Sequence, residues 1–501
     1  MGLIDNLISG LRTRIVGWLE GEWNPEYTER SRSMIERRDY RLGEQKRFLR
    51  RSREGFDDNI VGNFLGLALN KSISLLFGQD VDFDFGEEAP EEIVDWIEDI
   101  WEANNKPILL HKLAMFGGEA GTVFVKLVQD NEIGWRIVPQ DPVFKDVVTD
   151  PDDGEEVIRY ITQYKYTDFD DREIAKREEI TAGNYVAETR RDEGVNDVTE
   201  IKQGDPNEIP PNWLIQNFVS SRETGGKWKL VSEEVWPFPK PPVIHWQNLP
   251  MVSSVWGMPD LPDDVVELQD KSNFNLSNIN RIIRFFAHPF RWSRMFGGAR
   301  LGGKSDDSDM DAGPEKMPNK DNPAAEIFQL PPVGDVPGAL AHAQNLRQMI
   351  FDVTRNADIT SMKDRIGQLT NFGLKVLFHD ALNKLETKRA LYGWGLREIN
   401  RRIFMFSGYE PIDCEIVWEN PMPVDEQALR QNMEADLRMG VVDKQTVSER
   451  LGYDWETVKA RLEEQQQADA DIGAMALENF DRFGFGGGTQ TIERQRQPVA
   501  R

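Results

Sequence analysis

Residues Pro262 to Phe286 read PDDVVELQDKSNFNLSNINRIIRFF, a stretch that contains no glycine. Its apolar side chains recur at helical spacing, which predicts one long helix that ends before Pro289. This stripe consists of Leu268, Leu276, Ile279, Ile283 and Phe286. A compact insert rich in Gly, Pro and Asp follows, and a second helix is predicted at about 337–355. The chain therefore runs out along one helix, through a small insert, and back along another.

The sequence before this stretch predicts helices followed by an antiparallel sheet. Residues 90–104 have the pattern of an amphipathic helix with Pro90 in its first turn, and a second helix follows at about 108–116. The apolar period then changes to two, which predicts strands at 122–128, 134–138 and 157–166, separated by turn signals. The predicted fold class is α+β.

The sequence after the second helix is mainly helical. A break at 356–370 precedes a third long helix at about 371–406, and one strand is predicted at 412–418. Two or three helices follow between 424 and 470, where Thr446-Val-Ser-Glu449 fits a capping box and predicts a helix start. We expect the glycine-rich, polar tail at 471–501 to be disordered without a partner.

The 501-residue chain is acidic, with 60 Lys and Arg against 86 Asp and Glu and a net charge of -26. A protein that reads DNA sequence is ordinarily basic, so this class is disfavoured. Residues 27–53 are the exception and are predicted to form a basic helix or helix pair. Candidate contacts to phosphate or to a neighbouring subunit are Arg37, Arg38 and Arg41. The alternative is a solvated face paired with acids of the same or the next subunit.

One stretch fits a nucleotide-binding pattern. Gly298-Ala-Arg-Leu-Gly-Gly-Lys-Ser305 matches the phosphate loop, in which backbone amides and a lysine cradle phosphates. The context disagrees, because a helix precedes the stretch where a buried strand is needed and four aspartates follow within 306–311. An ATP-dependent DNA-processing enzyme that uses Gly298–Ser305 therefore remains an alternative function.

No other feature predicts an enzyme, a cofactor or a membrane anchor. The five histidines are scattered, and Cys414 is the single cysteine, so neither a zinc site nor a disulfide framework is expected. The most apolar run, Ile60 to Gly78, carries Asn63, Asn70 and Lys71, which a bilayer span would not ordinarily hold at its centre. We expect no catalytic residue, no metal, no cofactor and no membrane partner.

The order of these parts, together with particular residues, resembles the phage portal protein family over essentially the whole chain. Similar segments are Pro242-Val-Ile-His-Trp-Gln-Asn248, Trp256-Gly-Met-Pro-Asp-Leu261, Phe286-Ala-His-Pro289, Val417-Trp-Glu-Asn-Pro-Met-Pro423 and Met439-Gly-Val-Val-Asp-Lys-Gln-Thr446. The resemblance implies a portal architecture: an α/β wing, a two-helix stem, a small α/β clip insert, a long kinked helix with a tunnel loop, and a helical crown.

On this resemblance the wing comprises residues 1–261 together with the long helix and strand at 371–423. The other implied parts are stem helices at 262–286 and 337–355, a clip at 287–336, a tunnel loop at 356–370 and a crown at 424–470.

The resemblance also implies a function. A ring of twelve subunits would surround a channel at one capsid vertex, through which the terminase packages double-stranded DNA without sequence specificity. The implied partners are further copies of the chain, the large terminase, a head-completion adaptor, and the major capsid and scaffolding proteins. The protein would retain the genome with head-completion and tail proteins and later eject it, residing in the virion and, during assembly, in the host cytoplasm. A capsid protein without a channel is another alternative.

Two sets of site residues follow from the resemblance. In the clip, arginine and aromatic side chains are the expected partner contacts because they dominate interface energies. They are Arg291, Trp292, Arg294 and Phe296. Hairpin packing between subunits is the alternative. The tunnel loop is expected to touch the DNA backbone weakly, and an ordinary helix connection is the alternative. Its candidate residues are Thr360, Ser361, Lys363 and Arg365.

Overall fold

The computed structural model describes most of the chain in segments. These are residues 25–51, 55, 57–86, 89–167, 171–190, 198–220, 227–287, 291–294, 326–329, 336–358, 373, 376–421, 426–450 and 455–462. The chain divides into two compact units, Met1–Pro421 and Met422–Arg501, and each is described by itself. Helices and antiparallel strands occur together in the first unit, which confirms the predicted α+β class.

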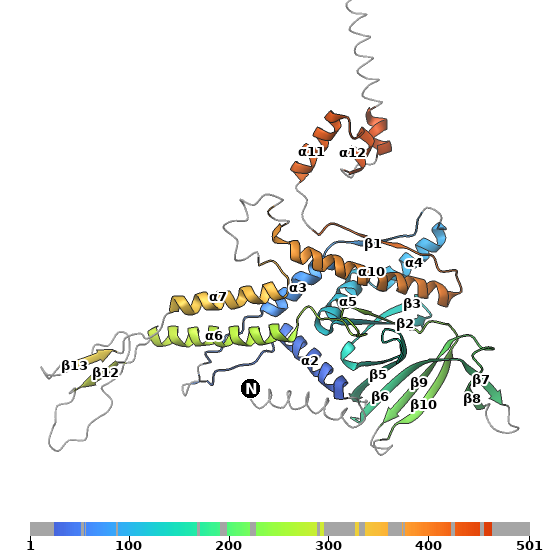
Figure 1. Ribbon diagram of the computed structural model, residues 1–501, viewed down its shortest axis with the longest axis horizontal. Coiled ribbons are helices and arrows are strands. Elements are labelled where there is room, and N and C mark those ends of the chain that lie inside the picture. The colour runs from blue at the N-terminus through green and yellow to red at the C-terminus, as the bar shows by residue number, and fades with distance from the viewer. Residues whose placement is uncertain are drawn as a thin grey trace, which may run out of the picture. The chain divides into compact units, whose positions relative to one another are not determined.

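The main core of the first unit forms where three helices pack against a three-stranded sheet (Figure 1). The helices are α3 (Phe64–Phe77), α5 (Lys106–Ala120) and α10 (His379–Ser407). The sheet has the order β11-β2-β3, with β11 (Val243–Gln247), β2 (Thr122–Asp130) and β3 (Gly134–Gln140). Tyr392 of α10 packs so closely on Gly117 of α5 that a Cβ there would lie 2.0 Å from its hydroxyl. Glycine is therefore required at this helix crossing.

A second, larger antiparallel sheet extends from this core in the order β10-β9-β6-β5-β4. Its strands are β4 (Lys145–Thr149), β5 (Val157–Thr167), β6 (Glu173–Gly183), β9 (Asn212–Ser220) and β10 (Lys229–Trp236). The short helix η1 (Pro142–Phe144) leads from β3 into β4, and β7 (Tyr185–Arg190) pairs with β8 (Val198–Gln203). Helix α4 (Glu91–Ala103) lies on the core through Ile97, Ile100 and Trp101. The predicted helices and strands of this half are therefore confirmed.

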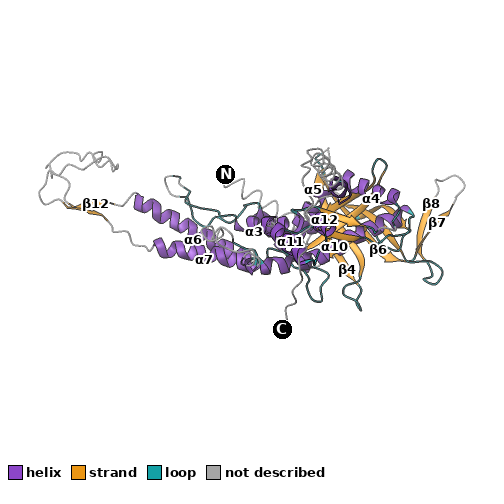
Figure 2. Cartoon of the chain, turned by 90° about the horizontal axis from the view of Figure 1, so that it is seen from above, coloured by secondary structure: helices purple, strands orange, loops and turns teal. Residues whose placement is uncertain are grey.

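The two helices predicted around the insert lie side by side (Figures 1 and 2). They are α6 (Asp263–Ala287) and α7 (Val336–Val353), and the described parts of the insert are the paired strands β12 (Arg291–Arg294) and β13 (Glu326–Gln329). Helix α7 is followed by a turn in which Arg355, with a φ of 56°, lies in the left-handed region. We call α6 and α7 the helical hairpin.

The prediction of a basic helix or helix pair at 27–53 is wrong in its second half. Helix α2 spans Pro25–Arg41. Two residues beyond its end lies Gly43, whose φ of 83° turns the chain out of the helix. The described residues among 44–62, which we call the strap, are not helical and run alongside α6. They bond to a polar face of that helix: the Ile60 N–H donates to Ser277 Oγ at 2.9 Å and the Gly62 N–H to Asn273 Oδ1 at 3.0 Å. These tertiary bonds replace the helical ones that the local pattern predicts.

Two further predicted boundaries differ from the structure. The regular part of the third helix, α10, begins at His379 rather than at 371, because Phe378, with ψ 3°, interrupts the helical geometry. The strand predicted at 412–418 is shorter: β14 (Glu415–Trp418) pairs antiparallel with β1 (Val81–Asp84). The first and the last described strands of this unit therefore meet in one ladder.

In the second unit the predicted helix start at Thr446 is wrong. Helix α11 spans Glu426–Met439, and α12 spans Lys444–Arg450. Asp443 precedes α12, and its Oδ1 accepts a hydrogen bond from the Thr446 N–H at 3.1 Å. Aspartate is a preferred N-cap residue because its short side chain reaches the free amides of the first turn. The capping box places the helix start too late because a better cap lies three residues before Thr446.

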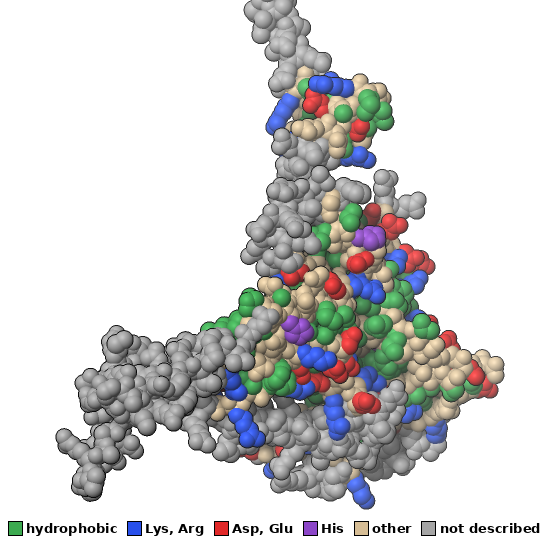
Figure 3. All heavy atoms as spheres, turned by 60° about the vertical axis from the view of Figure 1, so that its left-hand side comes forward, with side chains coloured by type: hydrophobic (Ala, Val, Ile, Leu, Met, Phe, Trp, Pro, Cys, Tyr) green, Lys and Arg blue, Asp and Glu red, His purple; other side chains and the backbone are tan. Residues whose placement is uncertain are grey.

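Charged side chains of both signs are intermingled on the face of the first unit in Figure 3. Many form pairs between neighbouring elements, such as Arg30 with Asp146 at 3.0 Å and Arg159 with Glu179 at 3.7 Å. The chain's net charge of -26 thus coexists with local neutralisation. Pairs of this partly exposed kind contribute little individually, but they mean that the total charge does not describe the surface at any one point.

One cation is buried between the sheets. Lys145 of β4 is 1% exposed and donates a hydrogen bond to Thr162 Oγ1 of β5. Burial lowers the pKa of its ammonium to about 7, although the carboxylate of Glu178 opposes that effect. The folded protein therefore binds this proton more weakly than the unfolded chain.

We expect Lys145→Met to stabilise the protein at pH 7 by roughly 2 kcal/mol. The pKa of Lys145 is lower in the folded state, so folding is penalised below pH 7 and the penalty falls as the pH rises toward the unfolded pKa. The gain over wild type should accordingly shrink between pH 7 and 10. Urea unfolding at pH 7, 8 and 9 measures it, and a gain independent of pH would contradict the assignment.

Candidate functional site at the base of the helical hairpin

The helical hairpin meets the core of the first unit at one buried carboxylate. Asp260 lies three residues before α6 and is 2% exposed. Lys384 Nζ lies 2.8 Å from its Oδ1, and Lys388 Nζ lies 2.6 Å from its Oδ2. Both lysines come from successive turns of α10, so they present their ammonium groups on one face of that helix. A single carboxylate thus joins the start of α6 to the first turns of α10.

Lys384 also contacts the end of α7. Lys384 Nζ donates to the Thr354 carbonyl at 3.0 Å, and the Asn356 amide donates to the Ala68 carbonyl of α3 at 3.2 Å. Lys71 of α3 donates to the Ala357 carbonyl at 2.8 Å. Cations near the C-terminus of a helix are stabilised by its unpaired carbonyls and its dipole. Both helices of the hairpin are therefore tied to α3 and α10 at this point.

The electrostatics of this cluster follow from its burial. Burial alone would raise the pKa of the Asp260 carboxyl, but Lys384 and Lys388 outweigh it and hold that pKa well below its usual range. Burial lowers the pKa of the Lys388 ammonium, against the attraction of Asp260. Tyr392 completes the cluster, since its hydroxyl donates to Asn248 Oδ1 at 2.9 Å. The carboxylate stays ionised at neutral pH, and each of its two oxygens pairs with one lysine ammonium group.

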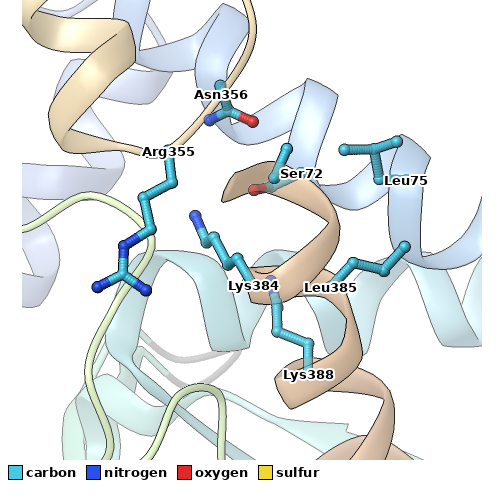
Figure 4. A pocket seen from close by; sticks show the side chains of 8 residues that line it. Ser72, Leu75, Arg355, Asn356, Lys384, Leu385 and Lys388 are labelled. Carbon is cyan, nitrogen blue, oxygen red and sulfur yellow. The ribbon is translucent and has the colours of Figure 1, made fainter. Parts of the chain in front are cut away.

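A small pocket, open to solvent, lies beside these lysines. It is bounded by α3, the end of α7 and the first turns of α10 (Figure 4). Its lining residues are Ser72, Leu75, Arg355, Asn356, Ala381, Lys384, Leu385 and Lys388. In Figure 4 the Lys384 side chain points from α10 toward the end of α7, where Arg355 and Asn356 lie. We call Asp260, Lys384, Lys388 and the pocket the joint.

The candidate contacts Arg37, Arg38 and Arg41 all form ion pairs within the chain. Arg38 binds Asp141 through two nitrogens, at 2.7 and 2.8 Å, and its Nε lies 3.0 Å from Glu119. Arg41 pairs with the same Glu119, while Arg37 pairs with Asp263 at 2.9 Å. The alternative of pairing with acids of the same subunit is thus observed for these three. Contacts to phosphate or to a neighbouring copy stay a prediction.

A family comparison decides what this architecture is. The family described as phage portal protein, SPP1 Gp6-like, matches residues 23–471, which is most of the chain. The chain belongs to the phage portal protein family. A separate search of curated proteins finds no match for the chain.

Portal proteins form the channel at a capsid vertex through which DNA is packaged, and they are structural components of the virion. The family forms a homo-oligomeric ring and associates with the capsid and the terminase. The geometry of the joint agrees with a structural role, since its charges are used to hold helices together. Among the described residues, no group of His, Cys, Asp and Glu could hold a metal ion, and no helix is long and apolar enough to cross a membrane.

Only some of the predicted clip and tunnel-loop residues fall among the described residues. Arg291, Trp292 and Arg294 lie on β12, whose backbone pairs with β13 in the register Trp292 to Phe328. Phe296 lies outside the described residues. So do the tunnel-loop candidates Thr360, Ser361, Lys363 and Arg365, and the phosphate-loop match Gly298–Ser305. Of the predicted tunnel loop at 356–370, the structure describes residues 356–358.

Sequence reasoning missed Asp260, Lys384 and Lys388. One signal was available, because Lys384 and Lys388 fall on the buried stripe of α10 that Ala381, Leu385 and Tyr392 define. A cation on an apolar stripe is either extended to the surface or paired in the interior. The sequence gives no means of locating Asp260 as the partner, since it lies more than a hundred residues away.

Proposed function

We propose that the chain assembles into a ring of twelve copies around a channel at one capsid vertex. In this proposal the terminase drives double-stranded DNA inward through the ring, and head-completion and tail proteins then retain the genome until it is ejected. Assembly would take place in the host cytoplasm. The wing, stem, clip, tunnel loop and crown would have the boundaries that the resemblance implies, with the helical hairpin as the stem.

The observation that carries the proposal is the composition of the helical hairpin. Its two helices bury one side against each other and the strap, yet they expose large apolar side chains elsewhere. These are Ile283 of α6 and Leu340, Met349 and Val353 of α7, each between 42% and 51% exposed. Phe274 of α6 packs edge-on against Phe48 of the strap, with the ring centroids 5.8 Å apart. Exposed apolar faces on opposite sides of one element suit head-to-tail contacts that close into a ring.

The proposal predicts that the full chain forms rings and that Met349→Asp on the exposed face of α7 disrupts them. A carboxylate at a contact between hairpins would be desolvated, which costs several kcal/mol per contact, and the cost recurs at every interface of the ring. Negative-stain images and mass photometry of the full chain measure the outcome. Gln129→Asp, which adds the same charge at an exposed position of β2, is the matched control and should leave the rings intact.

The result that would overturn the proposal is equally direct. Top views of wild-type particles that lack a central hole would overturn the ring itself. Rings that persist unchanged in Met349→Asp would remove this face of the hairpin from the subunit contact. The terminase and adaptor contacts at Arg291, Trp292, Arg294 and Phe296 would then need a separate test by pull-down with each partner. The proposed DNA contacts at Thr360, Ser361, Lys363 and Arg365 are tested by packaging assays on heads that carry alanine variants.

A further inference from the structure

The joint concentrates positive charge in a chain that is otherwise acidic. Five cations gather at the base of the helical hairpin: Lys71, Arg347, Arg355, Lys384 and Lys388. Two carboxylates answer them, since Asp260 is shared by two lysines and Asp358 lies 2.9 Å from Arg347. This set therefore carries a net charge of +3, whereas the whole chain carries -26. Evenly distributed charge would give the opposite sign.

The pocket opens into this positive region. Three of its eight lining side chains are cationic, and none is acidic. Lys384 and Lys388 are 5% and 1% exposed, so their ammonium groups are held in a fixed and largely dry setting. Arg355 also lines the pocket and is exposed, and its guanidinium forms no ion pair with the described part of the chain. Uncompensated buried charge is costly, and an anion in the pocket would offset it.

We propose that this pocket binds a phosphate-class oxyanion. A tetrahedral oxyanion accepts several charge-assisted hydrogen bonds at once, which suits an ammonium from one side and a guanidinium from the other. The ligand is either free inorganic phosphate or a phosphodiester of the DNA backbone. Only the DNA source rests on the proposed channel function; the pocket is argued from the chain's own side chains.

A competing explanation accounts for part of the charge. Lys384 and Lys71 donate to carbonyls at the end of α7, where cations are favoured without any ligand. This explanation does not extend to Arg355, whose side chain forms no contact of that kind among the residues described here. It also does not extend to Lys388, which donates to the shared carboxylate and lies over the Tyr392 ring, 5.8 Å from its centroid. The two explanations differ in what they predict for Arg355.

The test titrates the full-length protein with inorganic phosphate, at constant ionic strength maintained with sodium chloride. Line broadening of the phosphorus NMR signal measures binding, and the shift in melting temperature gives an independent readout. We expect saturable binding that Arg355→Asn weakens by about tenfold. Asparagine tolerates the left-handed backbone at this position, so the variant should fold. Arg355→Lys should retain most of the affinity, and Lys271→Asn on the exposed face of α6 is the matched control.

Adding short duplex DNA distinguishes the two sources. Displacement of phosphate by the duplex assigns the pocket to the DNA backbone, and continued phosphate binding in its presence assigns it to the free anion. Either result supports an oxyanion site. An unsaturable response equal in wild type, Arg355→Asn and Lys271→Asn would overturn it, even if the chain forms rings with a channel. Conversely, specific phosphate binding without rings would keep the pocket and remove the channel.

Discussion

Asp260→Asn should destabilise the folded chain by about 3–5 kcal/mol, although it only replaces one carboxylate oxygen with an amide nitrogen. The carboxylate compensates two buried ammonium groups at 2.8 and 2.6 Å, and an amide cannot carry that charge. Lys384 and Lys388 would then have to lose a proton or draw in water. Urea unfolding of the full chain at pH 7 gives the change in free energy of unfolding.

A second variant makes this result specific. In Asp260→Asn combined with Lys388→Met one buried charge is removed with its partner, so part of the lost stability should return. The pH dependence is a further check. The folded pKa of Asp260 is lowered, so its contribution is complete above the unfolded pKa of about 3.9 and is lost only as the pH falls through the folded value. A loss below about 1 kcal/mol at pH 7 would show that the joint is not a buried ion cluster.

Arg38→Glu should cost a similar amount, about 3–5 kcal/mol. Arg38 forms a two-nitrogen pair with Asp141 and also contacts Glu119, whose side chain is 2% exposed. The variant would leave three carboxylates around Arg41 as the remaining cation. Arg47→Glu is the matched control, because the Arg47 side chain is 64% exposed and its pair with Asp57 should contribute less than about 1 kcal/mol.

Comparing unfolding with ring formation in these two variants separates folding from assembly. If Arg38→Glu fails to form rings, its unfolding curve should already show the loss, and the defect then belongs to the fold. If Arg47→Glu folds normally but loses rings or DNA packaging, the exposed end of the basic segment contacts a partner. Equal stability of Arg38→Glu and wild type would show that the pairs with Asp141 and Glu119 do not form in solution.

Much of the fold is visible in local sequence. The apolar stripe of 262–286 fixes α6 to within a residue at each end, and period-two alternation identifies β2, β3 and β5. These patterns work because each element buries one face, so its own spacing records the geometry. The strap shows where this fails. Its residues 44–53 belong to the basic segment predicted to be helical, yet α2 ends before Gly43, and Asn273 and Ser277 of α6 accept hydrogen bonds from backbone amides of the strap.

The candidate site was less predictable than the fold. The strong charge of Arg37, Arg38 and Arg41 was evident in the sequence, but their partners Asp263, Glu119 and Asp141 lie 78 to 226 residues away. Charge patterns show which side chains need a partner and leave the partner's identity open. The joint was missed for the same reason.

The sequence alone determined the order of elements, the excursion through α6, the insert and α7, and the resemblance to portal proteins, because periodicity and motif order are properties of neighbouring residues. Tertiary structure alone decided which charges meet: that Asp260 lies between Lys384 and Lys388, and that a chain of net charge -26 gathers five cations at the base of its helical hairpin. The physical reason is that an ion pair forms between side chains within 4 Å, and only the folded backbone brings such distant residues that close.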